Sequence, residues 1–287
     1  RQNSTRLGKM VFLRILSGAS SASLDDTVCK SIDGTVIIIS GCDGCGKNAE
    51  GRLRYFFKSR QVENMEKEKL DKMYDICFFD LDGTIIDSSP GITNSVMYAL
   101  EKFGIEETER EKLYKFIGPP LTDSFARFYG FDDEKSWKAV EYYREYYQDT
   151  GIFECSVYPG FEKSLKALKA AGKRLFVATS KPEVYARRII EHFDLDQYFE
   201  YVAGMELDGG RGSKAEVIGY LIDTCRMQDK KRILMIGDRE HDVLGAKQEG
   251  LDCMGVLYGF GNREELEKAG AVYVAGTPED IAGIILK

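Results

Sequence analysis

The sequence predicts an α/β protein in which a parallel sheet is covered by helices and carries one all-helical insertion. Two observations support this class. From residue 73 onward, short apolar runs alternate with amphipathic helical patterns, and between residues 90 and 155 only helical patterns occur. The apolar runs are continuous, as expected for strands buried on both faces of a sheet. The expected strands are residues 75–79, 174–179, 201–204, 232–236, 253–257 and 272–274.

The insertion is expected to contain at least two helices. Behind Pro90, a residue type that favours the first turn of a helix, apolar side chains recur every three or four positions. Residues 137–147 form a second, aromatic-rich helical pattern. Its tyrosines could line a ligand cleft, although packing between the helices of the insertion is the favoured interpretation. These tyrosines are Tyr142, Tyr143, Tyr146 and Tyr147.

Two further helices are expected between the later strands. Residues 161–171 carry one apolar stripe, and Gly172 ends that helix. In residues 213–225, apolar side chains such as Val217 and Leu221 recur at helical spacing. Helices that separate successive strands are the connections a parallel sheet requires.

Charge is unevenly distributed along the chain. The 287 residues have a formal net charge of −7, with 10 Lys and Arg against 5 Asp and Glu in residues 1–60 and 30 against 42 in the remainder. Because polyanions are bound by basic patches, this balance argues against general affinity for nucleic acid or anionic membranes. No apolar run approaches the ~20 residues of a membrane-spanning helix.

Cysteine usage bears on the compartment. Seven cysteines, an odd number, are scattered through the chain, which favours reduced thiols and a cytoplasmic location. Only Cys42 and Cys45 have CxxC spacing. With two His in the whole chain, the composition argues against a zinc site.

The strongest chemical signal is the motif DLDGT, from Asp80 to Thr84, directly after the expected strand 75–79. Side chains two residues apart at a strand end point the same way, toward the edge where open α/β sheets bind ligands. Burying two like charges is costly unless a proton or a cation is shared. The pair of Asp80 and Asp82 therefore indicates a divalent cation, and an all-oxygen site at a phosphate favours Mg²⁺.

A second pair of carboxylates follows the expected strand 232–236. Asp238 stands at the strand end and Asp242 lies one turn into the next helix, so both can reach the same edge of the sheet. His241 lies beside Asp242 at a position that metal binding does not require. Two strand ends with Asp clusters therefore predict one shared site.

Donor groups occur at two further positions on this edge. Thr179, Ser180 and Lys181 close the expected strand 174–179, and Lys214 opens the helix that follows a polar turn. Hydroxyl and ammonium donors aimed at the site would stabilise the charge on a transferring phosphoryl group. Taken alone, Lys214 would be interpreted as a solvated surface residue.

In this order, DxDGT, a strand-end Thr, a Lys and GDxxxD resemble the motifs of the haloacid dehalogenase superfamily, in particular its phosphoglycolate-phosphatase-like branch. The resemblance covers residues 73–287. It implies a Rossmann-like core, with the insertion at about 90–155 as a helical cap. Gly118, in a Gly-Pro-Pro loop of the insertion, matches a cap loop of that branch.

The resemblance also implies roles for the acidic residues. Asp80 would be the nucleophile that forms an aspartyl phosphate, and Asp82 would protonate the leaving oxygen and then activate water. Mg²⁺ would be held by Asp80, the backbone carbonyl of Asp82, and Asp238. Asp242 and Thr84 would support this site.

Among the donors, Thr179 and Lys214 would hold the phosphoryl oxygens. Ser180, Lys181 and Gly118 are candidate substrate contacts, and Lys181 could bind a distal charged group. The prediction is a cytoplasmic, Mg²⁺-dependent phosphatase acting on a small phosphomonoester, such as phosphoglycolate or a 5′-nucleotide. A sugar-phosphate mutase of the β-phosphoglucomutase type uses the same carboxylates and is the alternative. The sequence makes no prediction of oligomeric state.

Residues 1–72 are expected to form a separate segment that ends in a charged helical linker. An expected strand, 35–40, precedes a match to GxxxxGK at residues 41–47, where Asn48 replaces the usual Ser or Thr. Residues 34–62 resemble the start of a thymidylate kinase, but the segment has no room for the rest of a kinase. We expect a degenerate phosphate-binding loop, and a nucleotide-sensing regulatory element is the alternative.

Overall fold

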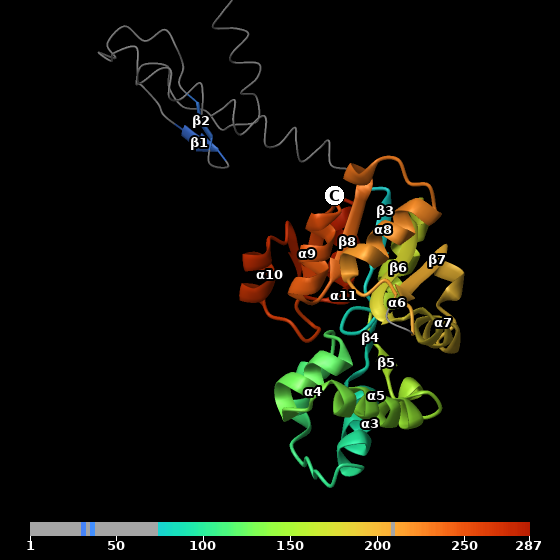
Figure 1. The fold of residues 1–287 in the computed structure, drawn as a ribbon. Helices are drawn as coiled ribbons and strands as arrows, with labels where there is room; N and C mark the ends of the chain where they lie inside the picture. The colour runs from blue at the N-terminus through green and yellow to red at the C-terminus, as the bar shows by residue number, and fades with distance from the viewer. Residues whose placement is uncertain (1–29, 33–34, 38–73, 208–209) are drawn as a thin grey trace, which may run out of the picture. The chain divides into compact units, whose positions relative to one another are not determined.

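The structure is a computed structural model that describes residues 30–32, 35–37, 74–207 and 210–287 (Figure 1). The chain divides into two units, Arg1–Lys72 and Met73–Lys287. In the first unit, the described residues are an antiparallel pair of strands, β1 (Lys30–Ile32) and β2 (Thr35–Ile37). The predicted phosphate-binding loop, residues 41–48, lies outside the described residues.

The second unit is built on a six-stranded parallel sheet of order β10-β9-β8-β3-β6-β7 (Figure 1). All six predicted strands are confirmed, and their ends differ from the prediction by at most three residues. This order sets β3 between β8 and β6, so the strand ends that carry the acidic and hydroxyl residues are neighbours. The strands are β3 (Ile76–Phe79), β6 (Arg174–Pro182), β7 (Tyr201–Met205), β8 (Ile233–Gly237), β9 (Asp252–Val256) and β10 (Tyr273–Ala275).

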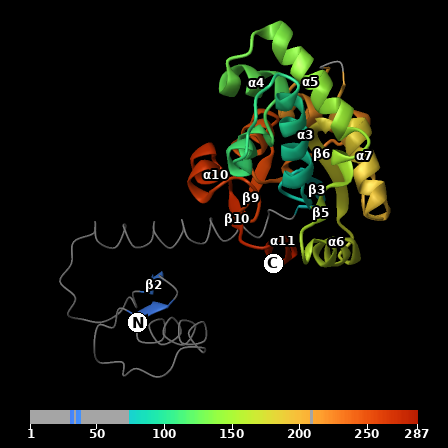
Figure 2. The same cartoon turned by 90° about the horizontal axis from the view of Figure 1, so that it is seen from below.

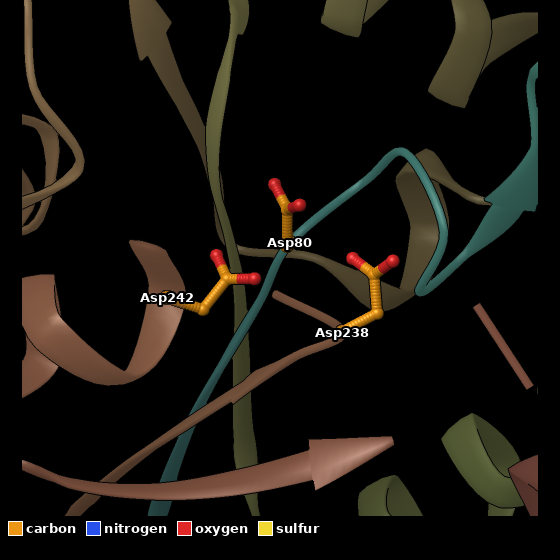
Figure 3. Close-up of side chains that lie close together, drawn as sticks. All are labelled: Asp80, Asp238 and Asp242. Atoms are coloured by element: carbon orange, nitrogen blue, oxygen red, sulfur yellow. The ribbon is translucent and has the colours of Figure 1, made fainter. Parts of the chain in front are cut away.

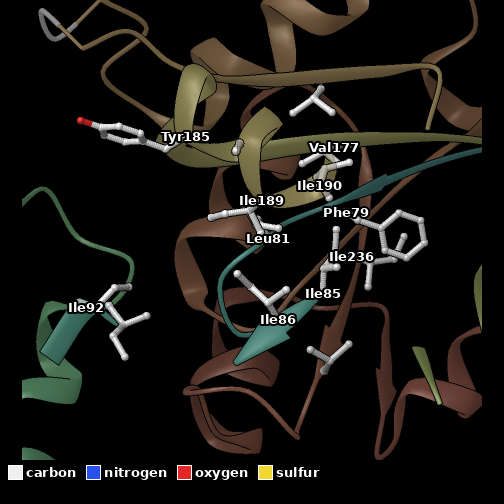
Figure 4. Packing of buried hydrophobic residues seen from close by; sticks show 14 of the residues in the cluster. Phe79, Leu81, Ile85, Ile86, Ile92, Val177, Tyr185, Ile189, Ile190 and Ile236 are labelled. Carbon is white, nitrogen blue, oxygen red and sulfur yellow. The ribbon is translucent and has the colours of Figure 1, made fainter. Parts of the chain in front are cut away.

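Successive side chains of the central strands enter two different hydrophobic clusters. Phe78 and Met235 belong to one cluster. The next residues along, Phe79 and Ile236, belong to the other, part of which Figure 4 shows. This is the period-two alternation of a strand with a covered layer on each face. The helices of the first cluster are α8 (Lys214–Thr224), α9 (Glu240–Gln248) and α10 (Arg263–Ala269). Those of the second are α6 (Phe161–Ala170), α7 (Glu183–His192) and α11 (Pro278–Ile285), and this cluster continues into the helices of the insertion.

The helical insertion lies between β4 (Ile86–Asp87) and β5 (Ser156–Val157). These two strands pair antiparallel, so the chain leaves and re-enters the core side by side. In both Figures 1 and 2, the insertion helices lie together as one group. The sequence did not predict β4 and β5, because two-residue strands carry no periodicity. The helices are α3 (Ser89–Glu101), η1 (Arg110–Phe116), α4 (Leu121–Tyr129), α5 (Asp133–Tyr147) and η2 (Gly151–Phe153).

Helix α5 begins four residues before the predicted helix 137–147. Its start is set by Asp132, whose side chain accepts a hydrogen bond from the backbone N–H of Lys135 at 2.8 Å. Asp is a preferred residue at this position because it satisfies an N–H group that lacks a partner within the helix. The acidic run before Trp137 therefore marks the true beginning of the helix.

None of the helices in the described ranges has the length and apolar character needed to cross a membrane. The four cysteines within those ranges are free thiols, and they are Cys77, Cys155, Cys225 and Cys253.

Candidate active site

Three carboxylates meet at the carboxyl edge of the sheet. Asp80 follows β3, Asp238 follows β8, and Asp242 lies in the first turn of α9. One oxygen from each lies within 4.8 Å of the others (Figure 3). The same carboxylates, together with Asp82, line a cavity of about 320 Å³ whose wall also includes residues of the helical insertion.

Asp238 is the least compensated of these carboxylates. Its Oδ2 accepts a hydrogen bond from the backbone N–H of Phe260 at 2.7 Å, whereas its buried Oδ1 has no hydrogen-bond partner among the described residues. Burial, and then the carboxylates of Asp242 and Asp80, raise the pKa of Asp238 well above its usual value. A cation among these oxygens would remove that cost. The residues therefore fit a small, hard metal ion that prefers oxygen ligands.

Lys214 is buried at the start of α8, not solvated as its residue type alone would suggest. Its Nζ lies 2.7 Å from Asp80 Oδ1 and 2.8 Å from Asp242 Oδ1, and it donates a hydrogen bond to the Ala178 carbonyl at 3.0 Å. Burial by itself would lower the pKa of Lys214, but the carboxylates of Asp242 and Asp80 raise it above its usual value. The ammonium therefore stays charged beside Asp80.

The turn after Asp80 needs its glycine. Gly83 has a φ of +79°, in the left-handed region, and a Cβ at this position would collide with the carboxylate of Asp238. The next residue, Thr84, is fully buried, and its carbonyl accepts a hydrogen bond from the Tyr258 hydroxyl at 2.9 Å. Gly83 thus permits the close approach of two motifs, and Thr84 joins the turn to the segment after β9.

The predicted donors of β6 also line the cavity, and Thr179, Ser180 and Lys181 all contribute to its wall. Thr179 Oγ1 accepts a hydrogen bond from the backbone N–H of Lys181 at 3.1 Å. The Lys181 ammonium lies 3.0 Å from Asp82 Oδ2 and donates a hydrogen bond to the Tyr147 hydroxyl at 2.7 Å. In this structure Lys181 thus contacts Asp82 and the insertion.

The tyrosines of α5 divide between the two interpretations of the sequence. Tyr143 and Tyr147 are buried and line the cavity. Tyr142 and Tyr146 instead pack inside the insertion, with ring centroids 5.6 Å from those of Phe103 and Tyr98, respectively. Packing was the favoured interpretation for all four tyrosines, and it describes only two of them. Residues four apart lie on the same face of a helix, so Tyr142 and Tyr146 face one set of neighbours and Tyr143 and Tyr147 face another.

Sequence reasoning missed two arginines that connect the insertion to the core beside the cavity. Arg239 Nη1 donates a hydrogen bond to the carbonyl of Ile117 at 3.1 Å, next to Gly118, which has a φ of +105°. Arg144 Nη2 donates to the carbonyl of Leu207 at 3.0 Å. The position of Arg239, directly after the motif Asp, could have drawn attention to it. No local signal distinguishes Arg144 from other charged residues on a helix.

Comparisons with known proteins agree on one class of relative. The profile of the haloacid dehalogenase-like hydrolases matches residues 77–256. A 5′-nucleotidase of Pseudomonas aeruginosa is 48% identical over 193 residues, which cover 67% of this chain and 87% of the relative. A phosphoglycolate phosphatase of Vibrio vulnificus is 26% identical over 216 residues, covering 72% of this chain and 94% of the relative.

Two solved structures extend the comparison. A predicted phosphatase from Clostridium acetobutylicum superposes with a TM-score of 0.72 at 45% identity, covering 75% of this chain and 99% of that chain. The protein tyrosine kinase A of Mycobacterium tuberculosis superposes with a TM-score of 0.66 at 36% identity, covering 75% and 99%. The shared region in each case is about as long as the second unit.

Proposed function

We propose, because the chain belongs to the haloacid dehalogenase-like hydrolases, that it hydrolyses small phosphomonoesters in a Mg²⁺-dependent reaction through an aspartyl phosphate. The profile match confirms the family that the motifs predicted. The names of the relatives support the prediction that the chain is a phosphoric monoester hydrolase. The observation that carries the proposal is Asp80, which lies beside the Lys214 ammonium, within reach of Asp238 and Asp242, on the wall of a cavity.

In the first step, an Asp80 oxygen would attack phosphorus. The new bond joins that oxygen to phosphorus while the bond from phosphorus to the leaving oxygen breaks, and Asp82 gives the leaving oxygen a proton to release an alcohol. An alkoxide leaves poorly, so ester cleavage needs this acid. Lys214, with Thr179, would stabilise the negative charge of the phosphoryl oxygens.

In the second step, water would attack the phosphorus of the aspartyl phosphate and displace the Asp80 carboxylate. Asp82 takes a proton from the water as its oxygen bonds to phosphorus, and the bond between phosphorus and Asp80 breaks. The products are inorganic phosphate and the free Asp80 carboxylate. Release of phosphate, and not of an isomer of the substrate, separates this reaction from that of a mutase.

Asp80, the backbone carbonyl of Asp82, and Asp238 would hold the Mg²⁺, with Asp242 and Thr84 in support. When bound, the ion supplies positive charge that offsets the charge of the phosphate. The paired burial of acidic side chains and the unpartnered Oδ1 of Asp238 support this assignment. The free thiols of the described residues support a cytoplasmic location.

Metal removal should abolish the activity. We expect p-nitrophenyl phosphate hydrolysis to stop in EDTA and to return with excess Mg²⁺, because the positive charge of the bound ion balances the carboxylates that line the cavity. Asp238→Asn should raise the Mg²⁺ concentration needed for half-maximal rate by about tenfold or more. The exposed Asp223→Asn is the matched control and should leave that concentration unchanged. Full activity in EDTA would contradict the metal assignment.

Substrate should enter the cavity beside Trp137. This residue, the chain's only tryptophan, lines the cavity from α5 and is 52% exposed. We expect titration with a 5′-nucleotide to change its intrinsic fluorescence, because the ring lies where a ligand replaces water. Phosphoglycolate, a much smaller ligand, provides the comparison. If a nucleotide is hydrolysed but leaves the fluorescence constant at saturation, its leaving group does not lie along this wall.

A further inference from the structure

A chain of three polar side chains joins the helical insertion to the proposed acid–base residue. The Lys181 ammonium lies 3.0 Å from Asp82 Oδ2 and donates a hydrogen bond to the Tyr147 hydroxyl at 2.7 Å. Tyr147 is the last residue of α5 in the insertion, whereas Lys181 belongs to β6 of the core. The contact therefore crosses from one part of the unit to the other.

We propose that Tyr147 is a positioning residue, whose hydroxyl holds Lys181 against Asp82 and thereby orients Asp82 toward the leaving oxygen of the substrate. The inference rests on the proposed function, since it concerns the residue that would transfer the proton. It assigns to the insertion a part in the chemistry as well as in covering the cavity.

The ring of Tyr147 is held from both sides. It stacks on Tyr143 of the insertion with ring centroids 5.2 Å apart, and it meets Tyr185 of α7 edge-on at 5.5 Å. Tyr147 is 2% exposed, and burial, then the charge of Asp82, raise its pKa well above its usual value. The side chain therefore offers Lys181 a neutral hydroxyl at a fixed place, without competition from water.

Lys181 is equally constrained. Its backbone N–H donates to Thr179 Oγ1 at 3.1 Å, and its side chain is 5% exposed. Burial by itself would lower the pKa of Lys181, but Asp82 raises it above its usual value, so the group stays an ammonium. A charged group with two fixed acceptors has little freedom to leave Asp82.

The two oxygens of Asp82 are left in different situations. Oδ2 faces the Lys181 ammonium, while Oδ1 is buried with no hydrogen-bond partner in the described part of the chain. Among the described residues, the Lys181 ammonium is therefore the one polar contact that holds this carboxylate on the wall of the cavity. Without Tyr147, Lys181 could shift, and Asp82 would lose the contact that sets its orientation.

The test uses the leaving group. Tyr147→Phe keeps the stacked ring and removes only the hydroxyl. In single-turnover reactions with enzyme in excess, release of alcohol from an alkyl phosphate such as a 5′-nucleotide should slow about tenfold or more, because this leaving group needs the proton of Asp82. Release of p-nitrophenolate, a good leaving group without protonation, should change little. Tyr146→Phe removes the hydroxyl of the preceding residue of α5, which packs inside the insertion and donates a hydrogen bond to Glu154, and it should keep the wild-type ratio of the two rates.

A second variant guards against a folding defect in the first. Lys181→Met should give the same selective loss, and the double variant should lose no more than Lys181→Met alone, because both changes interrupt one chain of contacts. Equal loss with both leaving groups, additive losses, or a Tyr147→Phe ratio equal to that of Tyr146→Phe would each overturn the inference. A wild-type protein that hydrolyses neither substrate would instead refute the proposed function.

Discussion

Asp80→Asn should reduce the rate of phosphate release by at least about a thousandfold, because it removes the proposed nucleophile of the first step. Asparagine has nearly the same shape as aspartate, and its amide oxygen can still accept a hydrogen bond from Lys214, which now lies 2.7 Å from Asp80 Oδ1. The loss is therefore expected in kcat without loss of the fold. Steady-state release of p-nitrophenolate and of inorganic phosphate with saturating Mg²⁺ measures it.

The matched control lies at the opposite end of the same strand. Asp75 precedes β3, is half-exposed, and forms an ion pair with Arg232. Asp75→Asn should retain nearly the wild-type rate, since this residue lies at the end of β3 remote from the carboxyl edge of the sheet. Wild-type activity in Asp80→Asn would show that another group attacks phosphorus, and the aspartyl-phosphate proposal would fail.

Lys214→Met should be the most destabilising change in the site. The substitution leaves the carboxylates of Asp80 and Asp242 without their shared cation, which is 6% exposed and makes both contacts below 3 Å. Removing one partner of a buried ion pair costs about 3–5 kcal/mol, so the free energy of unfolding should fall by that order. Phosphate release should fall by about a hundredfold or more, because a charged donor to the phosphoryl group is lost.

Chemical denaturation with and without Mg²⁺ separates these two effects. Mg²⁺ should stabilise the variant, since the ion can offset charge that Lys214 no longer balances. Lys230→Met provides the control, because Lys230 pairs with Glu249 while 43% exposed and should change stability by less than about 0.5 kcal/mol. If Lys214→Met unfolds at the wild-type denaturant concentration, Lys214 does not balance the acidic cluster.

The local patterns of the sequence were sufficient for the six strands of the parallel sheet and for the main acidic residues. A strand buried on both faces must be a continuous apolar run, and its carboxyl end must be where side chains such as Asp80 and Asp238 emerge. Parallel pairing of β3 with β8 and β6 then brings those ends together. The family prediction rested on the resemblance of four ordered motifs to those of the haloacid dehalogenase superfamily, and the profile match over residues 77–256 confirms it.

The partners of individual side chains were decided by tertiary contacts. Lys214 was readable as a surface residue until its burial beside Asp80 and Asp242 was known. Tyr147 and Tyr146 are neighbours in one aromatic stripe, yet only Tyr147 meets Lys181, because the direction of the α5 face depends on how the insertion sits on the core.

By itself, the sequence determined the α/β class, the six strands and the positions of Asp80, Asp82, Asp238 and Asp242 relative to strand ends. Each of these features depends on residues close together in the chain, so local periodicity and composition are enough to predict it. The tertiary structure decided the contacts between residues far apart in the chain, as between Asp82, Tyr147 and Lys181. Such contacts arise when packed elements are brought together, and no local pattern encodes which side chains will then meet.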